Sequence, residues 1–335
     1  MRNQHPADHG FTVIEFSIAS LATMVILASV FSLMTTVFSA SADMGQIMQT
    51  QQNLRVAMNT ITREITMAGT GLPANGIAVP NGGDAETLSR PGAGGVLATP
   101  NNTIAMIAPG NGIGPTINGA ATDAITIATI DQDSPSWTVQ TFDETGTDLL
   151  FVQEVRNGLN QLLAGDLLVF TNANGSVFGC VTDISMDESR AYFADDDAMN
   201  INQPEIAPSG NLKSIKGGGD GTTTATRMNI VTYYIDNSNP LHPRLMRAAN
   251  ASAPQVIVED VENLQFTFDL FNFANNNDSS NQPDTEFPNQ IRAVNVSLSG
   301  RSPSVLPKTD KYYRFALISK VNVRNNTFRN RYNGS

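Results

Sequence analysis

The sequence contains very little of what a metalloenzyme or a nucleophilic enzyme needs. Cys180 is the single cysteine, so an intramolecular disulfide is impossible. His5 and His9 lie in the first ten residues, which leaves His242 as the one histidine in the rest of the chain. Zinc sites need several Cys, His or carboxylate ligands, and a Ser-His-Asp triad would depend on a histidine that stands in the run Pro-Leu-His-Pro. That setting is typical of a turn, so we expect neither an enzyme nor a cofactor.

Positive charge is also scarce, because 20 Lys and Arg stand against 31 Asp and Glu. A general nucleic-acid binder neutralises phosphates with clustered Lys and Arg, so no nucleic-acid partner is expected. The exception is the end of the chain, where the basic residues outnumber the single Asp310; they are Arg301, Lys308, Lys311, Arg314, Lys320, Arg324, Arg329 and Arg331. Three interpretations stay open: the solvated face of a final strand, a contact with an acidic protein partner, or a contact with DNA.

Acidic side chains offer only weak metal candidates. Asp195, Asp196 and Asp197 are adjacent and carry the oxygen ligands that calcium prefers. The twelve-residue spacing and the glycine of an EF-hand are missing, so a solvated acidic loop is favoured and no metal site is predicted. The Asn-rich stretch 275–284 is interpreted in the same way, as a polar loop or a recognition surface. Cys180, between Gly and Val in an apolar run, is expected to be a buried small hydrophobe.

A long uncharged run stands near the N-terminus, from Phe16 to Ala42. It exceeds the ~20 residues that cross ~30 Å of hydrocarbon as a helix, whereas a secretory signal has a shorter apolar core followed by a cleavage site. The apolar pattern then continues at helical spacing through Ile47, Leu54, Met58, Ile61, Ile65 and Ala68. We therefore predict one helix over residues 11–68, ended by Gly69 and Gly71, with its first half in lipid and its second half on a soluble domain.

Glu15 is out of place at the start of this run. An ionised carboxylate in a bilayer costs several kcal/mol unless it is paired, so such a residue is a functional candidate by default. A hydrated position at the membrane interface is the alternative.

The residues before Glu15 favour the functional interpretation. Gly10-Phe11-Thr12-Val13-Ile14-Glu15 resembles the processing site of type IV prepilins and of type II secretion pseudopilins. The resemblance implies that prepilin peptidase cuts between Gly10 and Phe11 and methylates the new N-terminal Phe11. Residues 1–10 would be a discarded leader, although such leaders are usually basic and this one has only Arg2 against Asp8.

The resemblance also implies a role for Glu15, the fifth residue of the mature chain. Cleavage creates a positive amine at Phe11, and the carboxylate of a neighbouring subunit or of the same chain could neutralise it in an apolar setting. The pair would set the register of added subunits, and small residues along the helix would let neighbouring helices approach.

The rest of the chain changes character twice. Residues 69–122 are rich in Gly and Pro and are expected to connect elements, with a short strand near 103–108. From residue 123 a period-two pattern predicts an antiparallel β-rich head domain, residues 123–335, with a hairpin at Asn174-Gly175. The expected strands are 124–130, 137–142, 149–155, 165–171, 176–182, 228–235, 261–270, 291–298 and 313–323. The predicted class is α+β and pilin-like: one long N-terminal helix packed on an antiparallel sheet.

Several blocks in this region look like the PilW group of minor pilins, which are similar to J-type pseudopilins of type II secretion. The blocks are 63–69, 165–170, 230–235, 243–247, 258–266 and 319–325, together with Arg55 and Cys180. The resemblance implies a single-pass inner-membrane protein with its N-terminus in the cytoplasm and its head in the periplasm, later in the pilus outside the cell. Its partners would be prepilin peptidase, other minor pilins, the major pilin, the inner membrane and a tip adhesin. The expected function is to prime pilus assembly and cap the tip; a type II secretion pseudopilin and a tip adhesin or DNA-uptake subunit are the alternatives.

Overall fold

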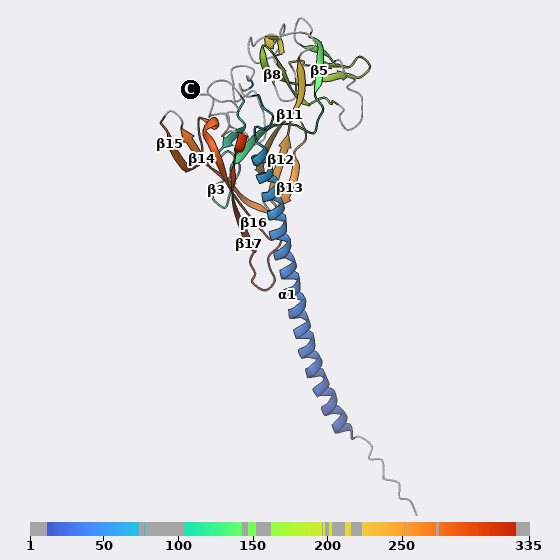
Figure 1. Cartoon of the computed structure of the whole chain (residues 1–335). Coiled ribbons are helices and arrows are strands. Elements are labelled where there is room, and N and C mark those ends of the chain that lie inside the picture. Colours follow the sequence, from blue (N-terminus) through green and yellow to red (C-terminus); the bar gives the residue numbers. More distant parts are fainter. Residues whose placement is uncertain are drawn as a thin grey trace, which may run out of the picture. The chain divides into compact units, whose positions relative to one another are not determined.

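Figure 1 shows the chain as a computed structural model. The structure describes residues 12–73, 77, 104–142, 147–151, 162–195, 197, 201–202, 212–215, 223–250, 252–272 and 275–325. The chain divides into two compact parts. The first part comprises residues 1–50 and 302–313, and the second comprises residues 51–301 and 314–335.

One α-helix, α1 (Val13–Met67), occupies the start of the described chain and confirms the expected long helix. No proline interrupts it, because the nearest ones are Pro6 and Pro73. The helix ends where Gly69 and Gly71 both take φ of +74°, a conformation that glycine adopts without strain. The side-chain amide of Asn325 also donates to the carbonyl of Ala68 at 2.8 Å, which satisfies one of the carbonyls left free at the helix end.

The last turns of α1, within the second part, pack into the main core. Leu54, Met58, Ile61, Ile65 and Ala68 are at most 6% exposed, as the spacing predicts. They are joined there by strand residues of both large sheets. Burying five such side chains contributes roughly 1.5–3 kcal/mol for each large one, which anchors this end of the helix to the sheets.

The described strands form two large antiparallel sheets, where the sequence predicted one. The first is organised around β11 (Thr224–Asp236), which pairs with β4 (Ala124–Ile130), β12 (Arg244–Ala249), β5 (Trp137–Phe142) and β7 (Leu167–Asn172). Its remaining strands are β1 (Ile107–Gly110), β6 (Asp148–Phe151), β8 (Gly175–Cys180), β9 (Asp183–Ser185), β10 (Arg190–Tyr192) and β13 (Gln255–Glu259).

The second sheet has the strand order β15 (Asn277–Gln282), β14 (Val261–Asn272), β16 (Ile291–Arg301) and β17 (Arg314–Asn322). The chain enters it at Asp260, the single residue between β13 and β14, whose φ is +62°. This left-handed residue turns the backbone sharply, so β14 leaves the first sheet. A small hairpin of β2 (Thr116–Ile117) and β3 (Ala120–Ala121) and two short 3₁₀ helices, η4 (Leu212–Ile215) and η5 (Pro288–Gln290), complete the described elements.

The strand β7 is buried on both faces. Leu167 and Val169 belong to the main core, whereas Leu168 and Phe170 belong to a second core that also holds Trp137. A strand that is covered on both faces has no solvent-exposed side, so both sets of alternating side chains are apolar. This explains the uninterrupted apolar run over residues 167–170.

Two local predictions were wrong. The Asn-rich stretch expected to be a loop contains β15, whose polar residues pair with β14, for example Asn277 with Asn272. The backbone of β15 forms its ladder hydrogen bonds although no apolar residues alternate along it. Alternation is the pattern that predicts a strand from sequence, so β15 was not expected. The β7–β8 turn also lies one residue earlier than expected, because Asn172 pairs with Gly175 and leaves Ala173-Asn174 as the turn.

Candidate functional site

The start of α1 carries the residue singled out from the sequence, Glu15. Its Oε2 accepts hydrogen bonds from the backbone N–H and the hydroxyl of Thr12, both at 3.0 Å. In return, the backbone N–H of Glu15 donates to the Thr12 hydroxyl oxygen at 3.3 Å. This is a capping box, in which two residues satisfy each other's free backbone donors at a helix N-terminus. Gly10 and Phe11 lie outside the described residues.

The capping box was missed in the sequence analysis, although the Thr-x-x-Glu spacing of Thr12 and Glu15 is its signature. It gives the carboxylate partners within its own chain. It also places the negative charge in the first turn, where the helix dipole favours an anion.

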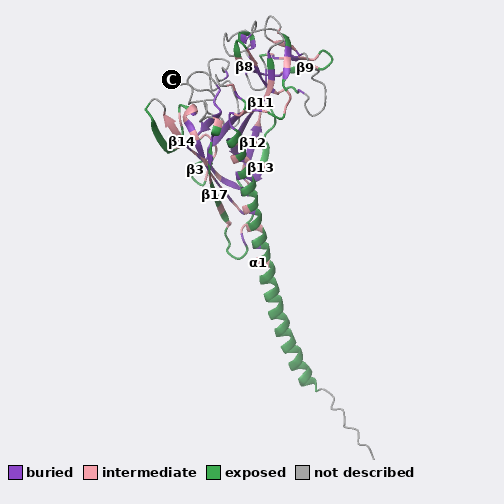
Figure 2. Ribbon diagram, viewed as in Figure 1, coloured by how far each residue is buried: buried purple, intermediate pink, exposed green. Residues whose placement is uncertain are grey.

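The first half of α1 presents an apolar surface. Its best window has a mean hydropathy of 2.1, and none of that window is buried. Figure 2 shows these turns exposed. Side chains such as Val13 (82% exposed), Phe16 (72%) and Phe31 (67%) have no cover within the described chain. The helix is long and apolar enough to cross a membrane, or to serve as a signal sequence, by length and composition.

Seven hydroxyl groups of this segment donate to carbonyls inside the helix. Ser17 donates to the carbonyl of Val13 and Thr23 to that of Ala19, both at 2.8 Å. The same bond to a carbonyl three or four residues earlier is made by Ser20, Ser29, Thr35, Thr36 and Ser39. Hydroxyls bonded in this way can enter hydrocarbon without an unpaired donor.

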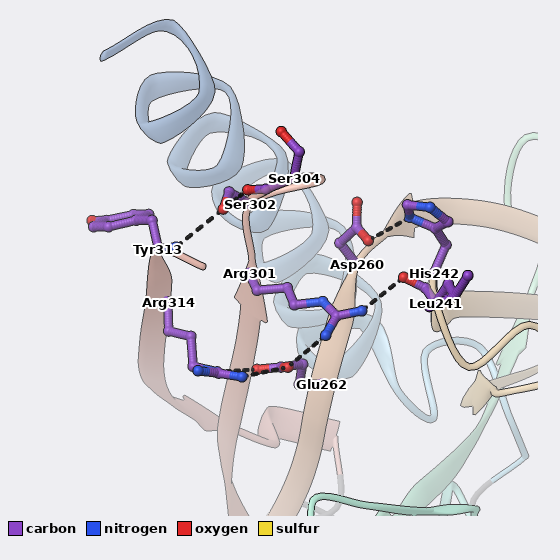
Figure 3. Close-up of polar contacts among 9 residues, drawn as sticks. All are labelled: Leu241, His242, Asp260, Glu262, Arg301, Ser302, Ser304, Tyr313 and Arg314. Atoms are coloured by element: carbon purple, nitrogen blue, oxygen red, sulfur yellow. Dashed lines mark hydrogen bonds and ion pairs between the residues drawn. The ribbon is translucent and has the colours of Figure 1, made fainter. Parts of the chain in front are cut away.

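Three of the basic residues near the C-terminus form internal ion pairs (Figure 3 shows two of them). Arg314 Nε lies 2.7 Å from Glu262 Oε2, and Arg301 Nη1 lies 3.4 Å from the other oxygen. Lys320 pairs with Asp269 in the same sheet. Apolar residues alternate with them along β17, as expected for one wet face, although Ile318 on that face is 81% exposed.

The Glu262 carboxylate is 7% exposed and lies between these two arginines. Burial alone would raise its pKa. The hydrogen bonds from Arg314 and Asn118 and the charges of Arg314 and Arg301 outweigh that effect, so the pKa is lowered. Arg301 also donates to the carbonyl of Leu241 at 2.7 Å, which ties the sheet to the β11–β12 turn (Figure 3).

His242 occupies that turn, as predicted. Its backbone N–H donates to the carbonyl of Asn239 at 3.0 Å, which closes the turn. Its Nδ1 lies 2.8 Å from Asp260 Oδ1. The contact joins the two ends of the β12–β13 hairpin, because His242 precedes β12 and Asp260 follows β13.

Two of the three candidate calcium ligands, Asp195 and Asp197, are among the described residues. Asp195 is exposed, and Asp196 lies outside the described residues. Asp197 is buried, and its Oδ1 accepts the backbone N–H groups of Ile201 and Asn202 at 2.8 and 2.7 Å. Among the residues that the structure describes, no group of three or more His, Cys, Asp or Glu could hold a metal ion.

Cys180 is 1% exposed in the main core, as expected for a small hydrophobe. Its backbone N–H donates to Asn202 Oδ1 at 2.8 Å. Burial, with the nearby charge of Asp197 as a further cause, raises the pKa of the thiol to about 12. The thiol is therefore held as an unreactive group.

A cavity of about 400 Å³ lies between the end of α1 and strands β4 and β11. Glu64 and Arg247 meet on its wall, with 2.9 Å between Arg247 Nη2 and Glu64 Oε1. Tyr233 is fully buried near them, and burial followed by the charge of Glu64 raises its pKa. The pair joins the helix to β12 and is consistent with a structural link.

Comparison of the chain with protein-family models, with curated proteins and with solved structures finds no match in any of the three.

Proposed function

We propose that this protein is a minor type IV pilin of the PilW kind. It is made as an inner-membrane prepilin, cut between Gly10 and Phe11, and methylated on Phe11. With other minor pilins it primes pilus assembly and takes a position at the tip. It is a substrate of prepilin peptidase and an assembly subunit, and it catalyses no reaction itself.

One observation carries the proposal: the long helix starts within the processing motif. α1 begins at Val13, three residues after Gly10, and runs without interruption for 55 residues. Its uncovered apolar half is long enough to cross a bilayer, and its last turns pack into the core of the sheets. A chain cut after Gly10 would thus begin with a membrane-compatible helix attached directly to a folded domain.

The capping box gives Glu15 a defined position from which to act. Its Oε2 lies 3.0 Å from the backbone N–H of Thr12, the residue that follows Phe11. The amine created by cleavage is on Phe11, one residue before Thr12, so Glu15 can neutralise it in the same subunit or pair with that of a neighbour. Loss of one partner of a buried pair costs about 3–5 kcal/mol, enough to decide whether a subunit docks.

The proposed topology places the leader in the cytoplasm and the sheets in the periplasm. The inner membrane, prepilin peptidase, the other minor pilins and the major pilin are the partners, with a tip adhesin as a further one. The acidic net charge of −11 supports protein partners over DNA.

The test compares Gly10→Val with Asp8→Ala, a leader substitution that leaves the junction intact. Cells whose own copy is replaced by each variant are examined for pili and for the mass of the protein. We expect the control to yield residues 11–335 with a methylated Phe11, and Gly10→Val to stay uncut in the membrane without supporting piliation. Normal pili with an uncut Gly10→Val chain would refute the processing step.

Glu15→Ala in the same cells addresses the assembly contact. We expect cleavage to persist while piliation falls, because the amine of Phe11 loses its counter-charge. Loss of secretion without loss of pili in the deletion strain would assign the protein to type II secretion instead.

A further inference from the structure

The loop between β16 and β17, residues 302–313, forms an ordered structure of its own. We call it the boundary loop. Ser302 N–H donates to the carbonyl of Tyr313 at 2.8 Å, and Leu306 N–H to that of Lys311 at 3.0 Å. Its tip closes through a bond of 2.9 Å from Asp310 N–H to the carbonyl of Leu306. A loop tied together at its base, middle and tip holds its side chains in fixed places.

The boundary loop lies against α1 within the first part of the structure. The hydroxyl of Ser304 donates to Gln46 Oε1 at 3.0 Å. Asp43 and Thr50 lie one turn to either side of Gln46 on the same helix face and are only 7% and 5% exposed. Met44 and Met48, on other faces, are 63% and 68% exposed. The helix is therefore covered on the face that the loop contacts.

This contact lies at the end of the apolar run. The uncharged run that starts at Phe16 ends at Ala42. Gln46 follows four residues later, about 6 Å further along the helix axis. The headgroup layer on each side of a bilayer is roughly 5–8 Å thick. If α1 spans the membrane, the boundary loop is held at the depth of the lipid headgroups.

The exposed side chains of the loop suit that depth. Lys308 within the tip and Lys311 just after it are exposed, against Asp310 alone. Tyr312 and Tyr313 follow, half-buried, and Figure 3 shows the Tyr313 ring pointing away from Ser302. Lysine reaches lipid phosphates through its flexible stem, and tyrosine is enriched at membrane interfaces. The loop concentrates positive charge in a chain whose net charge is −11.

We propose that the boundary loop is a membrane-surface contact, in which Lys308 and Lys311 bind the anionic phosphate headgroups of the bilayer that α1 spans. The inference rests on the membrane anchoring in the proposed function. Docked in this way, the loop sets how deeply α1 is inserted while the subunit is in the membrane, before it is assembled into a pilus.

The test uses the full chain carrying Cys180→Ala and Thr309→Cys, labelled at residue 309 with an environment-sensitive fluorophore. The protein is reconstituted into phosphatidylcholine vesicles with or without phosphatidylglycerol, and flotation measures insertion separately. We expect the label to be shielded from iodide in the anionic vesicles, and the shielding to fall when salt is raised. A label at Ser280→Cys, an exposed position in β15, is the control site and should stay accessible.

Single charge reversals identify the contact. The attraction of one lysine to an anionic surface is strong enough to change the ratio of docked to undocked loop about fivefold. Lys308→Glu and Lys311→Glu should each lower that ratio by at least this factor, while the exposed Lys213→Glu should leave it unchanged.

The outcomes separate the two proposals. A chain that fails to float with vesicles of either composition overturns the membrane anchoring and the loop contact with it. A chain that floats, but whose residue 309 is equally open to iodide with and without phosphatidylglycerol, overturns the loop contact alone. Shielding of residue 309 that stays the same in Lys308→Glu and in Lys311→Glu also overturns the loop contact, because the lysine charges would then play no part in it.

Discussion

At the scale of single residues, Glu15 has a local role at the helix start and, in the proposed function, a second role in assembly. Its carboxylate completes a capping box with Thr12. The same oxygen would lie beside the amine that cleavage exposes at Phe11. The capping hydrogen bonds stabilise the helix start, and the proposed function adds the pairing with that amine.

Cys180 carries a prediction about reactivity. Because its pKa is raised from 9.0 to about 12, the thiolate fraction near neutral pH is roughly a thousandfold below that of an ordinary thiol. We expect a disulfide reagent at pH 8 to modify the folded chain at least a thousandfold more slowly than the chain in denaturant. Fast modification of folded protein would contradict the buried position of the thiol.

At the scale of elements, the end of α1 depends on backbone freedom. Gly69 has φ of +74°, and an added Cβ would overlap the sulfur of Met106. We expect Gly69→Ala to lower the free energy of unfolding by about 2–4 kcal/mol, from the left-handed conformation and the overlap together.

The control for this prediction is Gly45→Ala within the same helix. A Cβ at Gly45 meets no atom within 4 Å, so alanine should be neutral or stabilise by up to about 1 kcal/mol. Urea unfolding in detergent micelles compares the two variants. Equal effects would mean that Gly69 has no special conformation.

The strands β14, β16 and β17 are joined through Glu262, and this link predicts a pH dependence. The pKa of Glu262 is lowered from its ordinary 4.5. The folded state therefore gains stability from this group above the unfolded pKa, and loses it as the pH falls through the lower folded pKa. We expect stability to decline in acid below about pH 4.5.

Glu262→Gln should remove part of this decline while lowering stability at pH 7, because two arginines lose their counter-charge. Thermal melts from pH 3 to pH 7 provide the measurement, with Glu286→Gln, on an exposed carboxylate, as the matched variant. A Glu262→Gln melt with the pH profile of the parent would exclude Glu262 as a source.

At the scale of the whole molecule, the chain combines an uncovered apolar helix with packed sheets. The proposed function requires the sheets to face the periplasm. In spheroplasts, added protease should destroy an epitope fused after Ser335 while a cytoplasmic marker stays intact. An epitope that is protected until the membrane is broken would reverse the topology.

Much of the fold could be predicted from the sequence. The uninterrupted apolar run and its helical continuation predicted α1 to within two residues of its start and one of its end, since no proline breaks it. Strand β4 matched its predicted range and β17 nearly did, because their alternation is clear. Strand β15 was not predicted, because polar residues form its ladder without an apolar face.

The candidate site was predictable only in part. Glu15 stood out because a carboxylate is costly next to an apolar run, whereas its pairing with Thr12 needed only a spacing rule that was not applied. The internal ion pairs of Arg301, Arg314 and Lys320 could not be foreseen, since their acidic partners are more than thirty residues away in the chain.

Local periodicity and charge determined the long helix, its apolar half and the period-two strands, because these depend on neighbours within a few residues. The tertiary structure alone decided that the strands divide into two sheets at Asp260, that β7 is buried on both faces, and that the boundary loop meets α1 at Gln46. Such contacts join residues far apart in the chain, and their energies depend on the packing of the complete fold.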